Sequence, residues 1–152
     1  MVQDRPLSEI TIRKYEKPYH LDRRELVKKI CLSLGLLQPG DSRDVVVDIL
    51  LILEENSKQG KATSSEEIKS RVEASRKEHN LEMKGIADSN IRRQLKRLRD
   101  LMLVEKKKNL YNLAEFANLQ EIFESKIEKF LIPQTIERIK EYLAELEKEE
   151  QK

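Results

Sequence analysis

The spacing of hydrophobic and polar residues predicts a mainly helical chain. In successive segments apolar residues recur every three or four positions, which is the period of an amphipathic helix. The second of these segments, Val45 to Leu53, is apolar on nearly every side and should form the central core helix. The first four segments begin behind residue types that cap helix N-termini: Asp22, Asp41 or Ser42, Thr63 or Ser64, and Asp88 or Ser89.

The fourth helix, Asp88 to Met102, combines an apolar and a basic face. Its apolar positions step by four, three and four residues: Ile91, Leu95, Leu98 and Met102. The remaining surface carries amide and basic side chains: Asn90, Arg92, Arg93, Gln94, Lys96, Arg97 and Arg99. Three of these, Asn90, Arg93 and Arg97, are predicted to lie along one outward edge. A helix of this kind has the side chains that read bases in the major groove of DNA.

A short hairpin is predicted directly after this helix. Its strands should be Leu103 to Glu105 and Leu110 to Leu113, joined by a tip from Lys106 to Asn109. Charge is concentrated in this region, because Lys84 to Lys108 holds nine basic and three acidic residues. From Ala114 to Lys152 there are instead ten acidic and six basic residues. The first stretch is therefore suited to binding a polyanion and the second is not.

The stretch from about Asp41 to Leu113 resembles the winged helix-turn-helix superfamily of prokaryotic and archaeal transcription regulators. The resemblance rests on the helix order, on SNIRRQLKRLRDLMLVEK and on the closing NLYNL. It implies that the Ser89 to Met102 helix docks in the major groove and that LMLVEKKKNLYNL forms the turn into the wing. The connection from Asn80 to Ala87 is longer than the tight turn of the simplest members. The chain then divides into an N-terminal arm and helix (1–40), the winged domain (41–113) and a C-terminal helical extension (114–152).

The candidate DNA-contacting residues come from the basic helix and the wing. They are Asn90, Arg92, Arg93, Gln94, Lys96, Arg97, Lys106, Lys107 and Lys108. Helix residues would contact bases and phosphates, while the wing lysines would contact phosphate or the minor groove. The alternatives are a solvated face on a protein-binding winged helix and a hairpin tip that only aids solubility. For the basic arm, which holds Arg5, Arg13, Lys14 and Lys17, we favour packing on the core or a partner subunit over DNA contact.

The C-terminal extension contains a heptad-like seam that predicts a homodimer. Pro133 should end one helix and begin another. Beyond it, apolar residues step by four, three, four and three: Ile132, Ile136, Ile139, Leu143 and Leu146. The alternative is that this seam packs within the chain, against the apolar Val45 to Leu53 helix.

Enzymatic activity, cofactors and metals are not expected. His20 and His79 are isolated, there is no glycine-rich phosphate loop, and the single Cys31 lies in an apolar helical pattern typical of a core residue. The longest apolar run is too short to span a bilayer, and the N-terminus lacks a signal-peptide core. We therefore expect a cytoplasmic protein.

These patterns together predict a mainly α-helical winged helix with a small β-hairpin. The predicted function is sequence-specific binding of double-stranded DNA by a homodimer, as in a transcription regulator. The alternative is a winged-helix protein-interaction module in a chromosome-segregation or transcription-initiation complex, which would keep the fold and give up the basic reading face.

Overall fold

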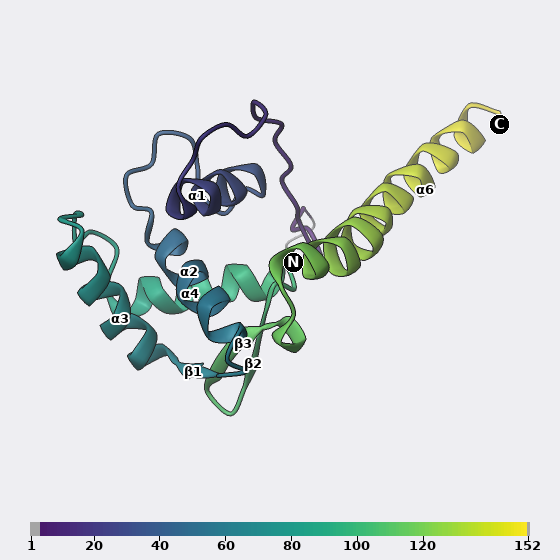
Figure 1. Cartoon of the computed structure of the whole chain (residues 1–152). Helices are drawn as coiled ribbons and strands as arrows, with labels where there is room; N and C mark the ends of the chain where they lie inside the picture. Colours follow the sequence, from purple (N-terminus) through teal and green to yellow (C-terminus); the bar gives the residue numbers. More distant parts are fainter. Residues whose placement is uncertain (1–3, 152) are drawn as a thin grey trace.

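The computed structural model describes residues 4–151, which form a mainly helical body and a long projecting helix (Figure 1). The body is built from four helices and a small three-stranded antiparallel sheet. Its elements, in chain order, are α1 (Arg23–Ser33), α2 (Val45–Ser57), β1 (Thr63–Ser64), α3 (Ser65–Glu78), α4 (Asp88–Asp100), β2 (Val104–Lys107) and β3 (Leu110–Leu113). The predicted fold class, mainly helical with a small hairpin, is confirmed at this level.

Helix α2 is the centre of the core, as its sequence predicts. It packs against α1, α3, α4 and β3, so its side chains meet apolar neighbours on several sides. Ile49, Leu50 and Leu53 are fully buried. Cys31 of α1 is also buried in this core, and burial raises the pKa of its thiol to about 12. Cys31 is therefore a small core residue, as expected from its apolar context.

A buried ion cluster joins α1, α2 and α3. Asp48, which interrupts the apolar face of α2, is 2% exposed and accepts hydrogen bonds from Arg24 at 2.5 Å and from Arg76 at 2.6 Å. Asp44, one turn earlier, lies 3.0 Å from Arg24 and 3.1 Å from Arg76. Burial alone would raise the pKa of Asp44, but the two guanidinium groups outweigh it and the pKa is lowered. Because each buried charge is paired with an opposite charge, the free-energy cost of burying it is offset.

The helix caps follow the sequence at α1 and α3 but not at α2 or α4. The N-cap of α2 is Asp44 rather than Asp41 or Ser42, and its side chain makes no capping hydrogen bond. Asp22 accepts a hydrogen bond from the Glu25 amide at 2.8 Å, and Ser64 accepts one from the Glu67 amide at 3.2 Å. At α4, the N-cap position is Ala87, and Asp88 is already inside the helix. The Asp88 carboxylate instead pairs with Lys69 of α3 at 2.8 Å. A tertiary ion pair has therefore replaced the local cap that the sequence favours.

The sheet has the order β1-β3-β2. Strand β3 has the predicted bounds, whereas β2 begins one residue later and ends two residues later than predicted. Val104 pairs with Leu113 and Lys107 with Leu110, which leaves only Lys108 and Asn109 in the turn. Both turn residues have positive φ angles, 51° and 65°. Two such residues form the type I′ turn whose twist matches that of the paired strands. Strand β1, at a position expected to be loop and helix cap, adds to β3 through Thr63 opposite Tyr111.

After the short 3-10 turn η1 (Ala114–Phe116), the C-terminal extension is one continuous helix. It begins as α5 (Leu119–Ile122), continues as the π-helical segment η2 (Phe123–Leu131) and ends as α6 (Ile132–Glu150). Pro133 was predicted to separate two helices, but the chain continues through it. In η2 each backbone amide donates its hydrogen bond to the carbonyl of the fifth preceding residue. The Ile132 amide, for example, donates to the Ile127 carbonyl. This wider turn directly precedes the proline, which itself lacks an N–H to donate.

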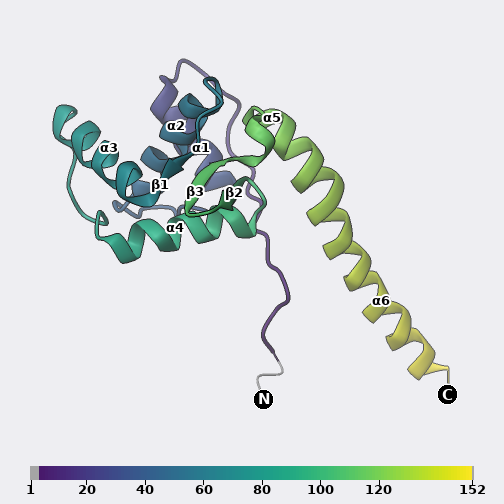
Figure 2. The same cartoon turned by 90° about the horizontal axis from the view of Figure 1, so that it is seen from below.

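Only the first part of this extension is anchored in the core. Ile122 and Ile127 are buried, whereas α6 has no buried residue. Figures 1 and 2 show α6 leaving the body and ending far from it. The first seam residue, Ile132, is partly buried against the core. The other four, Ile136, Ile139, Leu143 and Leu146, are 48–55% exposed, so the intramolecular alternative does not hold for them.

Candidate nucleic-acid interface

Helix α4 places an apolar stripe in the core and a basic face at the surface. Ile91, Leu95 and Leu98 are at most 1% exposed and pack in the core beside α2 and α3. The amphipathic helix predicted from spacing is thus confirmed, although the helix ends at Asp100 and Met102 lies beyond it with a φ of 64°. The exposed face carries four basic side chains: Arg92, Arg93, Lys96 and Arg99.

The basic side chains on this face are largely free of intramolecular partners. Within residues 4–151, the guanidinium groups of Arg93 and Arg99 make no hydrogen bond or ion pair. Arg92 lies close enough to Asp88 to lower the pKa of that carboxyl, after the larger effect of Lys69. Lys96 is paired with Asp100 at 3.2 Å, one turn along the helix, and both side chains remain mostly exposed. Such a solvated pair is worth at most about 1 kcal/mol and yields readily to a stronger partner.

A hydrogen-bonded chain of side chains runs along one flank of α4. Asn90 donates to the Gly85 carbonyl at 2.6 Å, and Gln94 donates to Asn90 at 3.1 Å. Arg97 donates to Gln94 at 2.9 Å and to the Gly35 carbonyl at 2.7 Å. The three residues are spaced four and three apart, so they form one row on the helix. We call this row, Asn90, Gln94 and Arg97, the flank chain.

The flank chain corrects the predicted outward orientation of Asn90 and Arg97. Asn90, Arg93 and Arg97 were expected to reach outward together, but only Arg93 does so. Asn90 and Arg97 are half-buried because each binds the carbonyl of a glycine in a connection outside α4. The flank chain therefore ties α4 to the connection before it and to the end of α1.

Gly35 occupies a position that requires glycine. It follows α1 with a φ of 72°, and a Cβ there would lie 2.5 Å from the Cβ of Thr11 in the arm. A side chain would thus be strained in backbone conformation and would also clash with Thr11. With the Arg97 bond, this one residue brings together the arm, α1 and α4.

The N-terminal arm packs against the body over residues 10–13. The Arg13 amide donates to the Ser33 carbonyl at 2.8 Å, and the Arg13 guanidinium donates to the Leu32 carbonyl at 2.7 Å. A second guanidinium nitrogen reaches the Gln38 side chain at 2.7 Å. Arg13 therefore satisfies carbonyls at the end of α1, in agreement with the interpretation that the arm packs on the core.

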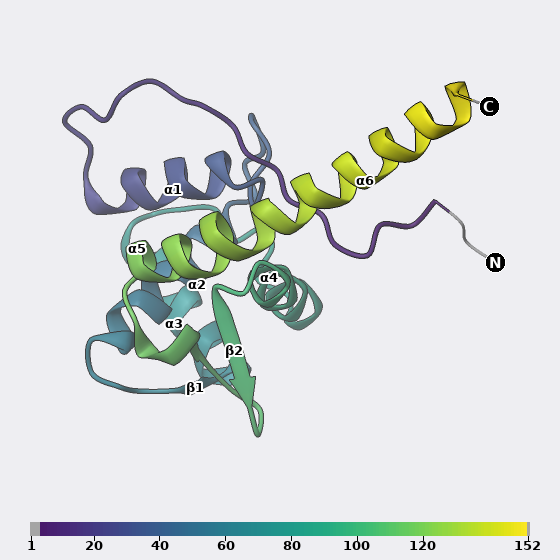
Figure 3. The same ribbon diagram turned by 90° about the vertical axis from the view of Figure 1, so that its right-hand side faces the viewer.

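The β2–β3 hairpin carries the three predicted lysines in different settings. The Lys106 ammonium lies 5.6 Å from the centre of the Tyr111 ring, its cross-strand neighbour. Lys107 is 3.9 Å from Glu105, with 78% of its side chain exposed. Lys108 is an exposed residue of the turn. Strand β2 packs directly against α4, and Figure 3 shows α4 end-on with the hairpin running beside it.

The structure thus separates the predicted site residues into two groups. Exposed cations are Arg92, Arg93, Lys96, Lys106, Lys107 and Lys108. The flank chain lies beside them and is bonded within the molecule. Arg99 belongs with the exposed group but was left out of the predicted site. Its spacing could have identified it, because Arg92, Lys96 and Arg99 step by four and three along one face.

Comparisons of the chain with protein-family models, with characterised proteins and with solved structures gave no match. None of the helices among residues 4–151 has both the length and the apolar character needed to cross a membrane.

Proposed function

We propose that the protein is a winged helix-turn-helix protein that binds double-stranded DNA. In this proposal α4 enters the major groove and the β2–β3 hairpin acts as the wing. The observation that carries it is the exposed face of α4, where Arg93 and Arg99 have no partner among the described residues. A free guanidinium can bind a phosphate or a guanine edge in bidentate fashion without first breaking an internal bond.

In this proposal the exposed cations contact DNA and the flank chain holds α4 in position. Arg92, Arg93, Lys96 and Arg99 contact bases and phosphates, and the wing lysines Lys106 to Lys108 contact the backbone. The flank chain has a positioning role, since its bonds to Gly85 and Gly35 fix the rotation of α4 about its own axis. It would reach bases only by exchanging these internal bonds for new ones, at a cost.

The proposal includes a homodimer formed by α6. The seam residues Ile136, Ile139, Leu143 and Leu146 are 48–55% exposed, and Tyr142 beside them is 73% exposed. Fully burying an aliphatic side chain of this size is worth roughly 1.5–3 kcal/mol. A closed pair of identical subunits is the simplest way to cover such a stripe. The dimer would place two α4 helices in successive major grooves and act as a transcription regulator by occupying its site.

The same exposed seam also favours the second candidate, a winged helix that binds another protein. Selection of bound duplexes from a random DNA pool separates the two functions. The regulator should enrich a two-fold symmetric motif with half-sites about one helical turn apart. A protein-interaction module would enrich no motif, and the DNA proposal would then be abandoned.

A further inference from the structure

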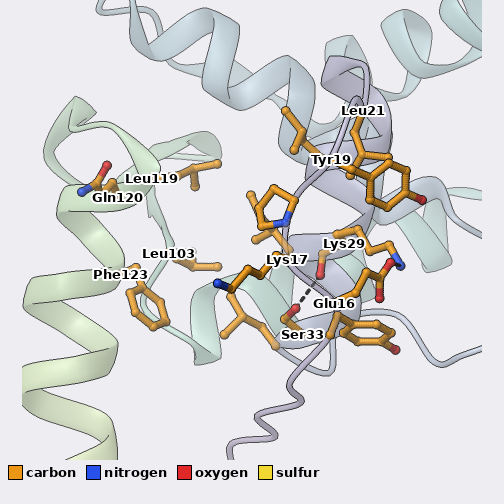
Figure 4. A pocket seen from close by; sticks show the side chains of 15 residues that line it. Glu16, Lys17, Tyr19, Leu21, Lys29, Ser33, Leu103, Leu119, Gln120 and Phe123 are labelled. Atoms are coloured by element: carbon orange, nitrogen blue, oxygen red, sulfur yellow. Dashed lines mark hydrogen bonds and ion pairs between the residues drawn. The ribbon is translucent and has the colours of Figure 1, made fainter.

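A cavity of about 540 Å³ lies between the N-terminal arm, α1 and the start of the C-terminal extension (Figure 4). Arm residues 15–19 and Leu21 cover one side, and α5 with the start of η2 forms the opposite side. Its size is within the range of small-molecule binding sites, about 300–1,000 Å³, and such sites occur where separate structural units meet. Nothing in the proposed DNA contact uses this cavity.

The walls of the cavity are mainly apolar. Leu26 and Ile30, one turn apart on α1, are 41% and 38% exposed although they are large aliphatic residues. Leu103, Leu119 and Phe123 face them from the other side. Leu103 is already buried, whereas Leu26, Ile30, Leu119 and Phe123 keep part of their apolar surface exposed. An apolar ligand between the walls would remove that surface from water.

The charges at the cavity leave one cation unbalanced. Lys29 is hydrogen-bonded to Glu16 at 2.7 Å and lies 4.7 Å from the centre of the Tyr15 ring. This pair is neutral overall. Lys17 has no hydrogen bond or ion pair within residues 4–151, and its side chain reaches toward Leu103 and Phe123 in Figure 4. The cavity thus presents apolar walls and a single available ammonium group.

We propose that this cavity binds a small apolar carboxylic acid. Its hydrocarbon part lies between Ile30 and Phe123, and its carboxylate pairs with Lys17. The bound acid touches the arm and α1 on one side and α5–η2 on the other. It therefore fixes the C-terminal extension against α1, and with it the direction in which α6 leaves the body. The binding proposal does not depend on DNA binding.

Decanoate is a suitable probe, with decanol as the neutral probe of equal chain length. Isothermal titration of the full chain at pH 7, below micelle-forming concentrations, should give tighter binding of decanoate than of decanol. The expected preference is about fivefold, as for a solvent-accessible ion pair. Lys17→Gln should remove the preference without changing decanol binding. Lys14→Gln, in the same arm but outside the cavity lining, is the matched control and should keep it.

A second variant locates the site. Ile30→Glu places a carboxylate inside the cavity at a partly exposed position, so the chain should fold and bind neither probe; circular dichroism checks the fold. Ile139→Glu, on the exposed seam of α6, should bind both probes as the wild type does. The proposal is overturned if the wild type binds no decanoate, if Lys17→Gln keeps the preference, or if binding is lost with Ile139→Glu rather than with Ile30→Glu.

Discussion

Two arginines of α4 that look equivalent in the sequence have different environments. Arg93 is exposed and unpaired, whereas Arg97 donates to Gln94 and to the Gly35 carbonyl, 62 positions away. Spacing alone puts both on the outer side of the helix. What distinguishes them is the end of α1, which comes close to one flank of α4 only in the folded chain.

Replacing each of these arginines by alanine should therefore give different results. Arg93→Ala should leave the free energy of unfolding within about 0.5 kcal/mol of the wild type, since surface changes rarely do more. It should weaken specific DNA binding by about 1–3 kcal/mol. Arg97→Ala should lower the free energy of unfolding by about 1–3 kcal/mol, because charged hydrogen bonds are lost. Urea denaturation and fluorescence anisotropy measure the two effects, and equal stability losses would contradict the assignment.

The buried cluster around Asp48 should make the stability of the protein sensitive to mutation. Asp48→Asn leaves the 2%-exposed Arg76 poorly compensated and should cost about 3 kcal/mol in urea denaturation. Asp100→Asn, an exposed carboxylate on α4, is the control and should cost little.

The lowered pKa of Asp44 gives the direction of the pH dependence. A carboxyl with a lowered folded-state pKa stabilises the protein above its unfolded-state pKa, which is 3.8 for an ordinary aspartate. This contribution is lost as the pH falls below that value toward the folded-state pKa. Asp44→Asn should therefore show a smaller acid-induced loss of stability than the wild type. An unchanged acid response would contradict this role.

At the scale of elements, the charges beside the α6 seam indicate how two copies would pair. With the seam at heptad positions a and d, Lys140 and Glu147 occupy e positions, and Thr135, Tyr142 and Glu149 occupy g positions. In a parallel pair each e residue faces the g′ residue of the preceding heptad. Lys140 would then face Thr135 and Glu147 would face Tyr142, so neither has an oppositely charged partner. In an antiparallel pair e faces e′, and each Lys140 then meets a Glu147 of the other copy.

We therefore expect an antiparallel α6 pair centred between Lys140 and Glu147. At 1.5 Å per residue, the two Ile132 residues would lie roughly 35 Å apart along the helix axis. This separation is on the scale of one DNA turn, about 34–36 Å. The two helical bodies would stand at opposite ends of the pair, as the proposed reading of two half-sites requires.

Charge exchange tests this arrangement. Lys140→Glu should raise the dimer dissociation constant roughly three- to tenfold, since two exposed pairs are lost and become repulsive. Adding Glu147→Lys should restore it. Lys148→Glu, an equal charge change on the outer side of α6, should have little effect. Sedimentation equilibrium measures all four proteins; a full-length wild type that is monomeric at tens of micromolar would refute the dimer itself.

At the scale of the whole molecule, the sequence predicts what depends on local periodicity. The apolar stripe of α4, the central position of α2 and the caps Asp22 and Ser64 all follow from residues within one or two helical turns. The structure departs from the sequence where distant segments meet. Lys69 donates a hydrogen bond to the carboxylate of Asp88, and the Gly35 carbonyl accepts one from the guanidinium of Arg97. These partners are set by tertiary packing, which short-range patterns do not encode.

The C-terminal extension shows the same division. The sequence predicts its heptad spacing and also predicts a helix break at Pro133. The π-helical segment before Pro133 joins the two helices into one, so that α6 projects from the body. Whether the seam packs internally depends on this direction, which the spacing of apolar residues leaves open.

The exposed cations of α4 and of the β2–β3 hairpin are proposed to bind DNA. The salt dependence of the affinity of the chain for a random duplex, measured by fluorescence anisotropy, tests this directly. The affinity should fall steeply with salt, and the logarithmic slope should become shallower by about two units in Arg93→Ala/Arg99→Ala, because each phosphate contact adds about 0.9. Lys58→Ala, at the exposed end of α2, should keep the wild-type slope. No binding by the wild type at low salt, or an unchanged slope in the double variant, would contradict the claim.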